Sequence, residues 1–135
     1  MMRNLWCYLA LLLLAGCATN APNACILDAQ GGDPQLVINN GGLQATCEIT
    51  GGRVLYEGDI MVGIVNLVSH VDEQRSYHMR WRWYDADNLQ ITTGEGQQNW
   101  RTQWVDALDA PQIQGRAPTP GAVRGEFQIR WVNAQ

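Results

Sequence analysis

The sequence contains no lysine and only two histidines among its 135 residues, so its nine basic side chains are all arginines. Acidic residues outnumber them, and the net charge is −4. A protein that neutralises nucleic-acid phosphates needs the opposite balance, so we expect no nucleic-acid partner. The chain also lacks an apolar run of the roughly 20 residues that a membrane-spanning helix needs. Its length indicates a single domain.

Motifs for catalysis or metal binding are scarce as well. No serine lies in a G-x-S-x-G pattern, and no two cysteines form a C-x-x-C unit. His70 and His78 could ligate a metal together with Asp72 or Glu73, but two surface imidazoles are the interpretation that we favour. We therefore expect no enzyme, no metal site and no cofactor.

The N-terminus has the features of a secretion signal. Arg3 supplies a positive start, and an apolar run of about ten residues follows it, which is too short for a transmembrane anchor. Residues 14–17 (LAGC) resemble the lipobox of bacterial lipoproteins. The resemblance implies transfer of a diacylglyceryl group to the Cys17 thiol, removal of residues 1–16, and acylation of the new terminus by a fatty acid such as palmitate.

Several acyl chains on one terminus hold a protein on a bilayer stably. Residue 18 is alanine, so the aspartate that retains lipoproteins in the inner membrane of enteric bacteria is missing. We therefore expect a lipid-anchored protein of the outer membrane that faces the periplasm.

Two cysteines remain once the signal and the lipid are accounted for. Cys7 leaves with the signal peptide and Cys17 carries the lipid, so Cys25 and Cys47 are left as a pair. In an exported chain such a pair predicts a disulfide, which would stabilise the fold by roughly 3 kcal/mol. A two-cysteine metal site is the alternative, although no histidine lies near either cysteine in the sequence.

The remaining chain divides into a tether and a domain. Residues 17–24 carry the lipid and are otherwise small and polar, which is typical of a short tether, and residues 25–135 form the predicted domain. Gly-Gly pairs at 31–32, 41–42 and 51–52 indicate turns between short strands.

Apolar periodicity predicts several strands directly. Residues 60–67 are apolar on both faces, as in a strand buried on both sides. Residues 77–84 and 123–131 alternate with period two, which predicts half-buried strands. No segment has a convincing helical stripe. We expect an all-β domain of about seven strands in two packed sheets, an immunoglobulin-like or transthyretin-like β-sandwich.

A turn ends the first of these alternating strands. Residues 85–88 (DADN) predict this turn, with Asn88 in the left-handed backbone conformation. Residues 89–91 could pair back as the second strand of a hairpin. Arg80 and Arg82 are expected on the solvent face, paired across strands with acids such as Glu126.

Five tryptophans lie beyond the predicted signal peptide. Trp81, Trp83 and Trp131 occupy alternating strand positions and are expected in the core. Trp100 and Trp104 lie in a stretch rich in Gln and Asn and are the candidate binding residues. They could stack on sugar rings or contact a protein partner, since tryptophan is enriched at binding hot spots. The alternative is that both cover one edge of the sandwich.

Two motifs resemble a known family. Residues 79–89 (MRWRWYDADNL) resemble the Y-R-x-x-W-Y-D-x-x-G-L core of the YcfL-like periplasmic lipoproteins, and residues 116–122 (RAPTPGA) resemble their A-P-x-P-x-A turn. The resemblance covers roughly residues 53–132. Asn88 replaces the usual glycine, a change that backbone stereochemistry tolerates. The Cys25–Cys47 pair is not a feature of that family. The resemblance implies a β-rich envelope lipoprotein without an assigned activity.

These features predict a non-enzymatic binding or accessory module of the cell envelope. Its expected contacts are the lipid bilayer, through acylated Cys17, and an envelope protein. The alternative hypothesis is a module that binds peptidoglycan or another glycan through Trp100 and Trp104.

Overall fold

The computed structural model describes residues 21–92, 94 and 98–132. The predicted signal peptide of residues 1–16 and the lipidation site Cys17 lie outside these residues. Within them the chain forms eight strands and one short helix, in the order β1 (Asn23–Asp28), β2 (Gln35–Val37), α2 (Gly41–Thr46), β3 (Cys47–Glu57), β4 (Ile60–Ser69), β5 (Arg75–Tyr84), β6 (Arg101–Val105), β7 (Gln112–Arg116) and β8 (Arg124–Trp131). The predicted all-β class is confirmed.

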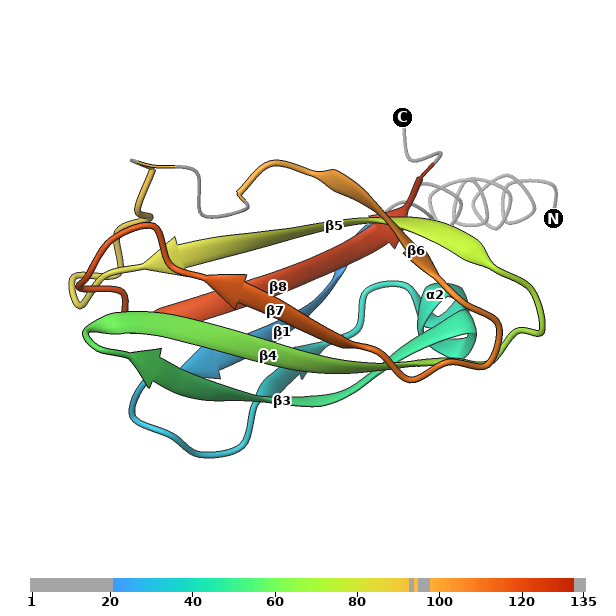
Figure 1. Cartoon of the computed structure of the whole chain (residues 1–135), viewed down its shortest axis with the longest axis horizontal. Helices are drawn as coiled ribbons and strands as arrows, with labels where there is room; N and C mark the ends of the chain where they lie inside the picture. The colour runs from blue at the N-terminus through green and yellow to red at the C-terminus, as the bar shows by residue number, and fades with distance from the viewer. Residues whose placement is uncertain (1–20, 93, 95–97, 133–135) are drawn as a thin grey trace, which may run out of the picture.

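The strands form two antiparallel sheets that face each other (Figure 1). One sheet has five strands in the order β2-β1-β8-β5-β6, and the other has three in the order β3-β4-β7. Apolar side chains from the two inner faces fill the space between the sheets, as in other sandwiches. No helix in the described part of the chain is long and apolar enough to cross a bilayer.

The three strands predicted from apolar periodicity are present. In β5, Tyr77, Met79, Trp81 and Trp83 are buried while the residues between them are partly exposed, and β8 lies beside β5 in full register. β4 has an unbroken buried run over residues 61–65, as expected for a strand covered on both sides.

The Trp81 ring packs against two glycines of the three-stranded sheet. Gly63 of β4 and Gly115 of β7 are register partners, and a Cβ atom on either would lie within 2.7 Å of the Trp81 ring. The other neighbours of this ring are Trp83, with centroids 5.3 Å apart, and Phe127, at 5.4 Å. Glycine at both positions therefore allows the three-stranded sheet to approach the indole closely.

The helix α2 was not predicted, because six residues are too few to show an apolar stripe. Asn40 caps its N-terminus by accepting a hydrogen bond from the Leu43 backbone N–H at 3.1 Å, and Leu43 is its buried residue. The buried Asn23 side chain accepts hydrogen bonds from the backbone N–H groups of Asn39 and Asn40. Asn23 also begins β1, so the predicted tether of residues 17–24 is too long and the fold starts by residue 23.

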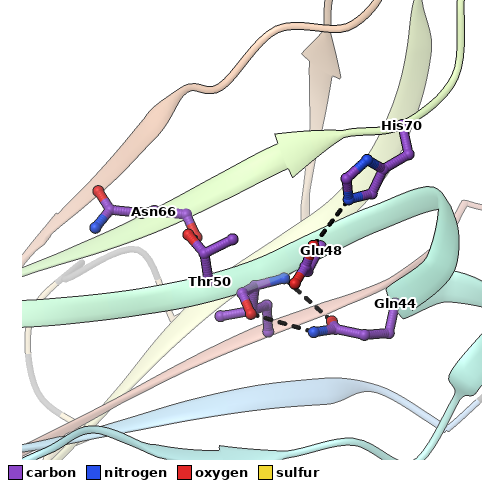
Figure 2. Close-up of polar contacts among 6 residues, drawn as sticks. Gln44, Glu48, Thr50, Asn66 and His70 are labelled. Carbon is purple, nitrogen blue, oxygen red and sulfur yellow. Dashed lines mark hydrogen bonds and ion pairs between the residues drawn. The ribbon is translucent and has the colours of Figure 1, made fainter.

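The side chain of Gln44 joins this helix to β3, as Figure 2 shows. Its Nε2 donates to the Ile49 carbonyl and its Oε1 accepts from the Ile49 N–H, both at 3.1 Å. The β3–β4 register then shifts between Ile49 and Gly51. The turn predicted at 51–52 is wrong, because both glycines lie inside β3; a Cβ on Gly52 would meet the Ile64 carbonyl at 2.8 Å.

The predicted turn after β5 is confirmed, but its hairpin partner is not a strand. Asn88 has φ of 62°, and the Asp85 carboxylate accepts hydrogen bonds from the backbone N–H groups of Asp87 and Leu89. Residues 89–91 contribute one isolated bridge, between Tyr84 and Gln90. β5 instead pairs with β8 and β6, which lie far from it in the sequence. β8 is the better partner because it supplies buried side chains that residues 89–91 lack.

Candidate binding face

The outer face of the five-stranded sheet gathers positive charge. Since the odd-numbered residues of β5 point into the core, the even-numbered ones point outward. The register sets them beside the even-numbered residues of β8. We call the four arginines that this alternation places on the outer surface the arginine face: Arg80, Arg82, Arg124 and Arg130.

Trp100 packs onto the arginine face. The guanidinium carbons of Arg80 and Arg130 lie 4.1 and 4.0 Å from the centroid of its ring, within the range of a cation–π interaction. The His78 ring lies 6.5 Å away, and Trp100 is half-buried. Because two guanidinium groups already pack against its ring, Trp100 is a structural part of this face and is not free to stack on a ligand.

Trp104 behaves differently. It lies on the edge strand β6 in register with Ser76, and 64% of its surface is exposed. Alternation along β6 places it on the same outer side of the sheet as Thr102 and His78. The structure therefore separates the two candidate residues: Trp104 is open to a ligand, whereas Trp100 is covered by arginines.

The expected cross-strand placement is confirmed for Arg82 and Glu126, but the ion pair expected from it is not formed. Arg82 and Glu126 are register partners, but they form no ion pair within 4 Å. The Glu126 carboxylate instead accepts hydrogen bonds from Gln128 Nε2 at 2.8 Å and the Tyr84 hydroxyl at 3.4 Å. Arg80 Nε donates to Gln128 Oε1 at 2.7 Å. Among the described residues, the arginine face thus has hydrogen bonds and ring contacts but no salt bridge.

The electrostatic environment of Arg80 reflects this clustering. Burial lowers the pKa of its guanidinium, and the neighbouring charges of Arg82 and Arg130 lower it further. Glu126 opposes this effect more weakly. A cluster of like charges with so little compensation is a favourable site for an anion.

A polar cavity of about 470 Å³ opens beside the arginine face. Its volume is within the range of sites for small ligands. Three arginines line it together with amide, hydroxyl and glycine residues of the following segment: Arg80, Arg82, Arg101, Gln90, Thr92, Gly94, Gln98 and Asn99. Sequence reasoning missed this site, because Gln98, Asn99 and Arg101 come to lie around one cavity with the arginines of β5 only in the folded chain.

The two histidines do not converge on a metal site. His70 Nε2 lies 2.8 Å from the Glu48 carboxylate, across β3 and β4 (Figure 2). His78 lies beside Trp100 on the opposite sheet. No group of three histidine, cysteine or acidic residues in the described ranges could hold a metal ion.

The predicted Cys25–Cys47 disulfide is not formed. Both cysteines are free and fully buried. The Cys25 sulfur lies 3.5 Å from where a Cβ atom on Gly52, in the middle of β3, would be. Cys47 is the first residue of β3, five residues before Gly52. Five residues of extended strand span about 16 Å, whereas a disulfide joins Cα atoms less than about 7 Å apart. The two thiols serve as apolar core residues.

Fold and surface together define a small β-sandwich domain with a basic and aromatic face on one sheet. A family model described as "Protein of unknown function (DUF1425)" matches residues 34–131, and the chain belongs to this family. A crystal structure of a DUF1425 family member from Shewanella sp. pv-4 is similar, with a TM-score of 0.58 and 17% sequence identity, over 82% of this chain and 98% of the other. That likeness concerns the fold. No curated protein matches the chain.

Proposed function

We propose that this protein is an outer-membrane-anchored periplasmic lipoprotein that serves as a binding or accessory module of the cell envelope. The lipobox-like residues 14–17 support the anchor, and the resemblance to YcfL-like lipoproteins is compatible with membership of the DUF1425 family. The binding role is carried by one observation. The arginine face has no salt bridge among the described residues and lies beside the exposed Trp104.

An arrangement of this kind is suited to recognition. Charged groups that form no salt bridge gain most from a ligand of opposite charge, and an exposed indole adds apolar contact area. The charge is also localised: the chain as a whole carries −4, while the arginine face carries four positive charges. We infer that this face is directed at an envelope component and not at the bilayer to which Cys17 would be attached.

The first test concerns the anchor and a protein partner together. The full-length protein should fractionate with the outer membrane, and a Cys17→Ser form carrying a signal for soluble export should be released. After crosslinking in the native host, an envelope protein should be retained by the wild type. Retention should fall at least tenfold in Arg82→Glu and remain in Arg53→Glu, because Arg53 is an exposed arginine on the opposite sheet.

Two results would contradict this proposal. Unchanged membrane association of the Cys17→Ser form would exclude a lipid anchor at Cys17. Equal partner capture by Arg82→Glu and Arg53→Glu would show that the arginine face is not the interaction surface.

Binding of peptidoglycan or another glycan is the second candidate function. The exposed Trp104 is a better candidate than Trp100 for the residue that stacks on the sugar. Trp104→Ala should weaken binding to isolated sacculi by about tenfold or more, the scale of a hot-spot contact. Tyr56→Ala is the matched control, because Tyr56 is an exposed aromatic residue of the other sheet. Sacculus binding that both variants retain would exclude a stacking role for Trp104.

A further inference from the structure

We propose that the cavity beside the arginine face binds a sugar that carries a carboxylate or a phosphate group, with Arg80, Arg82 and Arg101 holding the anion. This deepens the proposed function by naming a ligand class for the same face. The proposal stands on the composition of the cavity, on the fixed orientation of Arg80, and on the distribution of charge around it.

The cavity wall combines two kinds of groups. Its three arginines come from two adjacent strands, with Arg80 and Arg82 on β5 and Arg101 on β6. Guanidinium groups match carboxylate and phosphate oxygens because they present several donors in one plane. The remaining lining contains three side-chain amides, from Gln90, Gln98 and Asn99, and the hydroxyl of Thr92.

Amides and hydroxyls both donate and accept hydrogen bonds, which is what sugar hydroxyls require of a binding site. The cavity volume of about 470 Å³ is large enough for a ligand of the size of a sugar with an anionic substituent. A ligand that is only a small anion would leave the amide-lined part of this space without a partner.

Arg80 is already held in place. Its Nε donates to Gln128 Oε1 at 2.7 Å, and its guanidinium lies 4.1 Å from the centroid of the Trp100 ring. These contacts do not use its terminal nitrogens, and the residue lines the cavity. A guanidinium with a fixed orientation loses less conformational entropy when it binds, so the site is preorganised for an anion.

The surrounding charge favours the same ligand. In the described part of the chain, no carboxylate forms an ion pair with any of the three cavity arginines. Burial and the charges of Arg82 and Arg130 lower the pKa of Arg80, so these positive groups repel one another. A bound anion would turn this repulsion into attraction.

The test uses the mature protein purified in an uncharged detergent, so its outcome does not depend on the membrane anchor or on a protein partner. Four probes are titrated by calorimetry: glucuronate, glucose 6-phosphate, glucose and inorganic phosphate. Glucuronate and glucose 6-phosphate should bind at least ten times more tightly than glucose, which has the same ring without the charge. They should also bind more tightly than inorganic phosphate, which lacks the hydroxyls.

Variants locate the site. The double substitution Arg82→Gln and Arg101→Gln should weaken binding of both charged sugars by tenfold or more, on the scale of one lost charge-assisted contact. Arg53→Gln removes one positive charge, from the opposite sheet, and should leave binding unchanged. Thermal unfolding should confirm that all variants fold, since Arg101 is exposed and Arg82 is partly exposed.

The outcomes are distinct. Equal affinity for glucose and glucuronate, or equal binding by the double variant and Arg53→Gln, would overturn the site. Inorganic phosphate as strong as glucose 6-phosphate, or tighter binding to phosphatidylglycerol vesicles than to either charged sugar, would overturn the sugar as ligand. Sacculus binding that is lost in the double variant would support a sugar within the wall polymer, and binding of the small sugars alone would support a free ligand.

Discussion

Substituting alanine for Gly115 is expected to lower the free energy of unfolding by about 3 kcal/mol, the upper part of the range for overpacked cores. The new Cβ would lie 2.4 to 2.5 Å from three atoms of the Trp81 ring. That ring has no direction in which to move, because Trp83, Phe127 and Gly63 contact it elsewhere. Urea denaturation followed by tryptophan fluorescence measures the change.

Two controls isolate this contact. Gly51→Ala adds the same methyl group in β3, where nothing lies within 4 Å, and should change stability by less than about 0.5 kcal/mol. Combining Gly115→Ala with Trp81→Leu should cost at least about 1 kcal/mol less than the sum of the single changes, because the smaller side chain makes room for the methyl group. Strictly additive losses would show that the methyl group and the indole do not meet.

Alkaline pH is expected to destabilise the protein, by on the order of 2 kcal/mol for each buried thiol. Burial raises the pKa of Cys25 and of Cys47 from 9.0 to about 11. Above pH 9 the thiols of the unfolded chain lose their protons while those of the folded chain keep them. The contribution of the two thiols to the free energy of unfolding is therefore constant below pH 9, falls between pH 9 and 11, and levels off above that.

Tyr77 extends this loss to higher pH. Burial, and then the proximity of Cys47, raise the pKa of its hydroxyl from 10.0 to about 12. This side chain is fully buried, so it also resists ionisation in the folded state. We expect the decline in stability to continue above pH 10 as unfolded chains ionise at this third group.

Urea denaturation at pH 8 and pH 10.5, with a reducing agent present, measures the effect. Cys47→Ala should reduce the difference between the two pH values by about half of the thiol contribution, even though the variant is less stable at both. At pH 8 the reducing agent itself should leave the unfolding curve of the wild type unchanged. A loss of about 3 kcal/mol on reduction, with no thiol-dependent change between the two pH values, would favour a disulfide instead.

Several features of this fold arise from local sequence. The period-two pattern of residues 77–84 and 123–131 predicted β5 and β8, and the alternation alone assigned Trp81 and Trp83 to the core. Asn88 was predicted in the left-handed region because its side chain tolerates that conformation better than others do. Each of these predictions depends on neighbours within a few residues.

Predictions that relied on residues being close in space were less successful. The number of cysteines and an exported location predict a Cys25–Cys47 disulfide, yet the two residues lie too far apart along the direction of β3 to form one. The sequence shows that Glu126 and the arginines share a face, but not which neighbour each side chain contacts. The Glu126 carboxylate therefore accepts hydrogen bonds from Tyr84 and Gln128 where an ion pair with an arginine was expected. Gly51 and Gly52 predict a turn from sequence, but both lie inside β3, and only at Gly52 does the Ile64 carbonyl leave no room for a Cβ atom.

By itself, then, the sequence determined three of the strands (β4, β5 and β8), the solvent-facing side of β5, and the two tryptophans to examine, because strand periodicity is a local property. The tertiary structure alone decided that Trp100 packs on Arg80 and Arg130 while Trp104 stays exposed. It also decided that Arg101 meets Arg80 and Arg82 around one cavity. Those arrangements depend on the pairing of β5 with β6 and β8, a long-range register set by the whole core and not by any single segment.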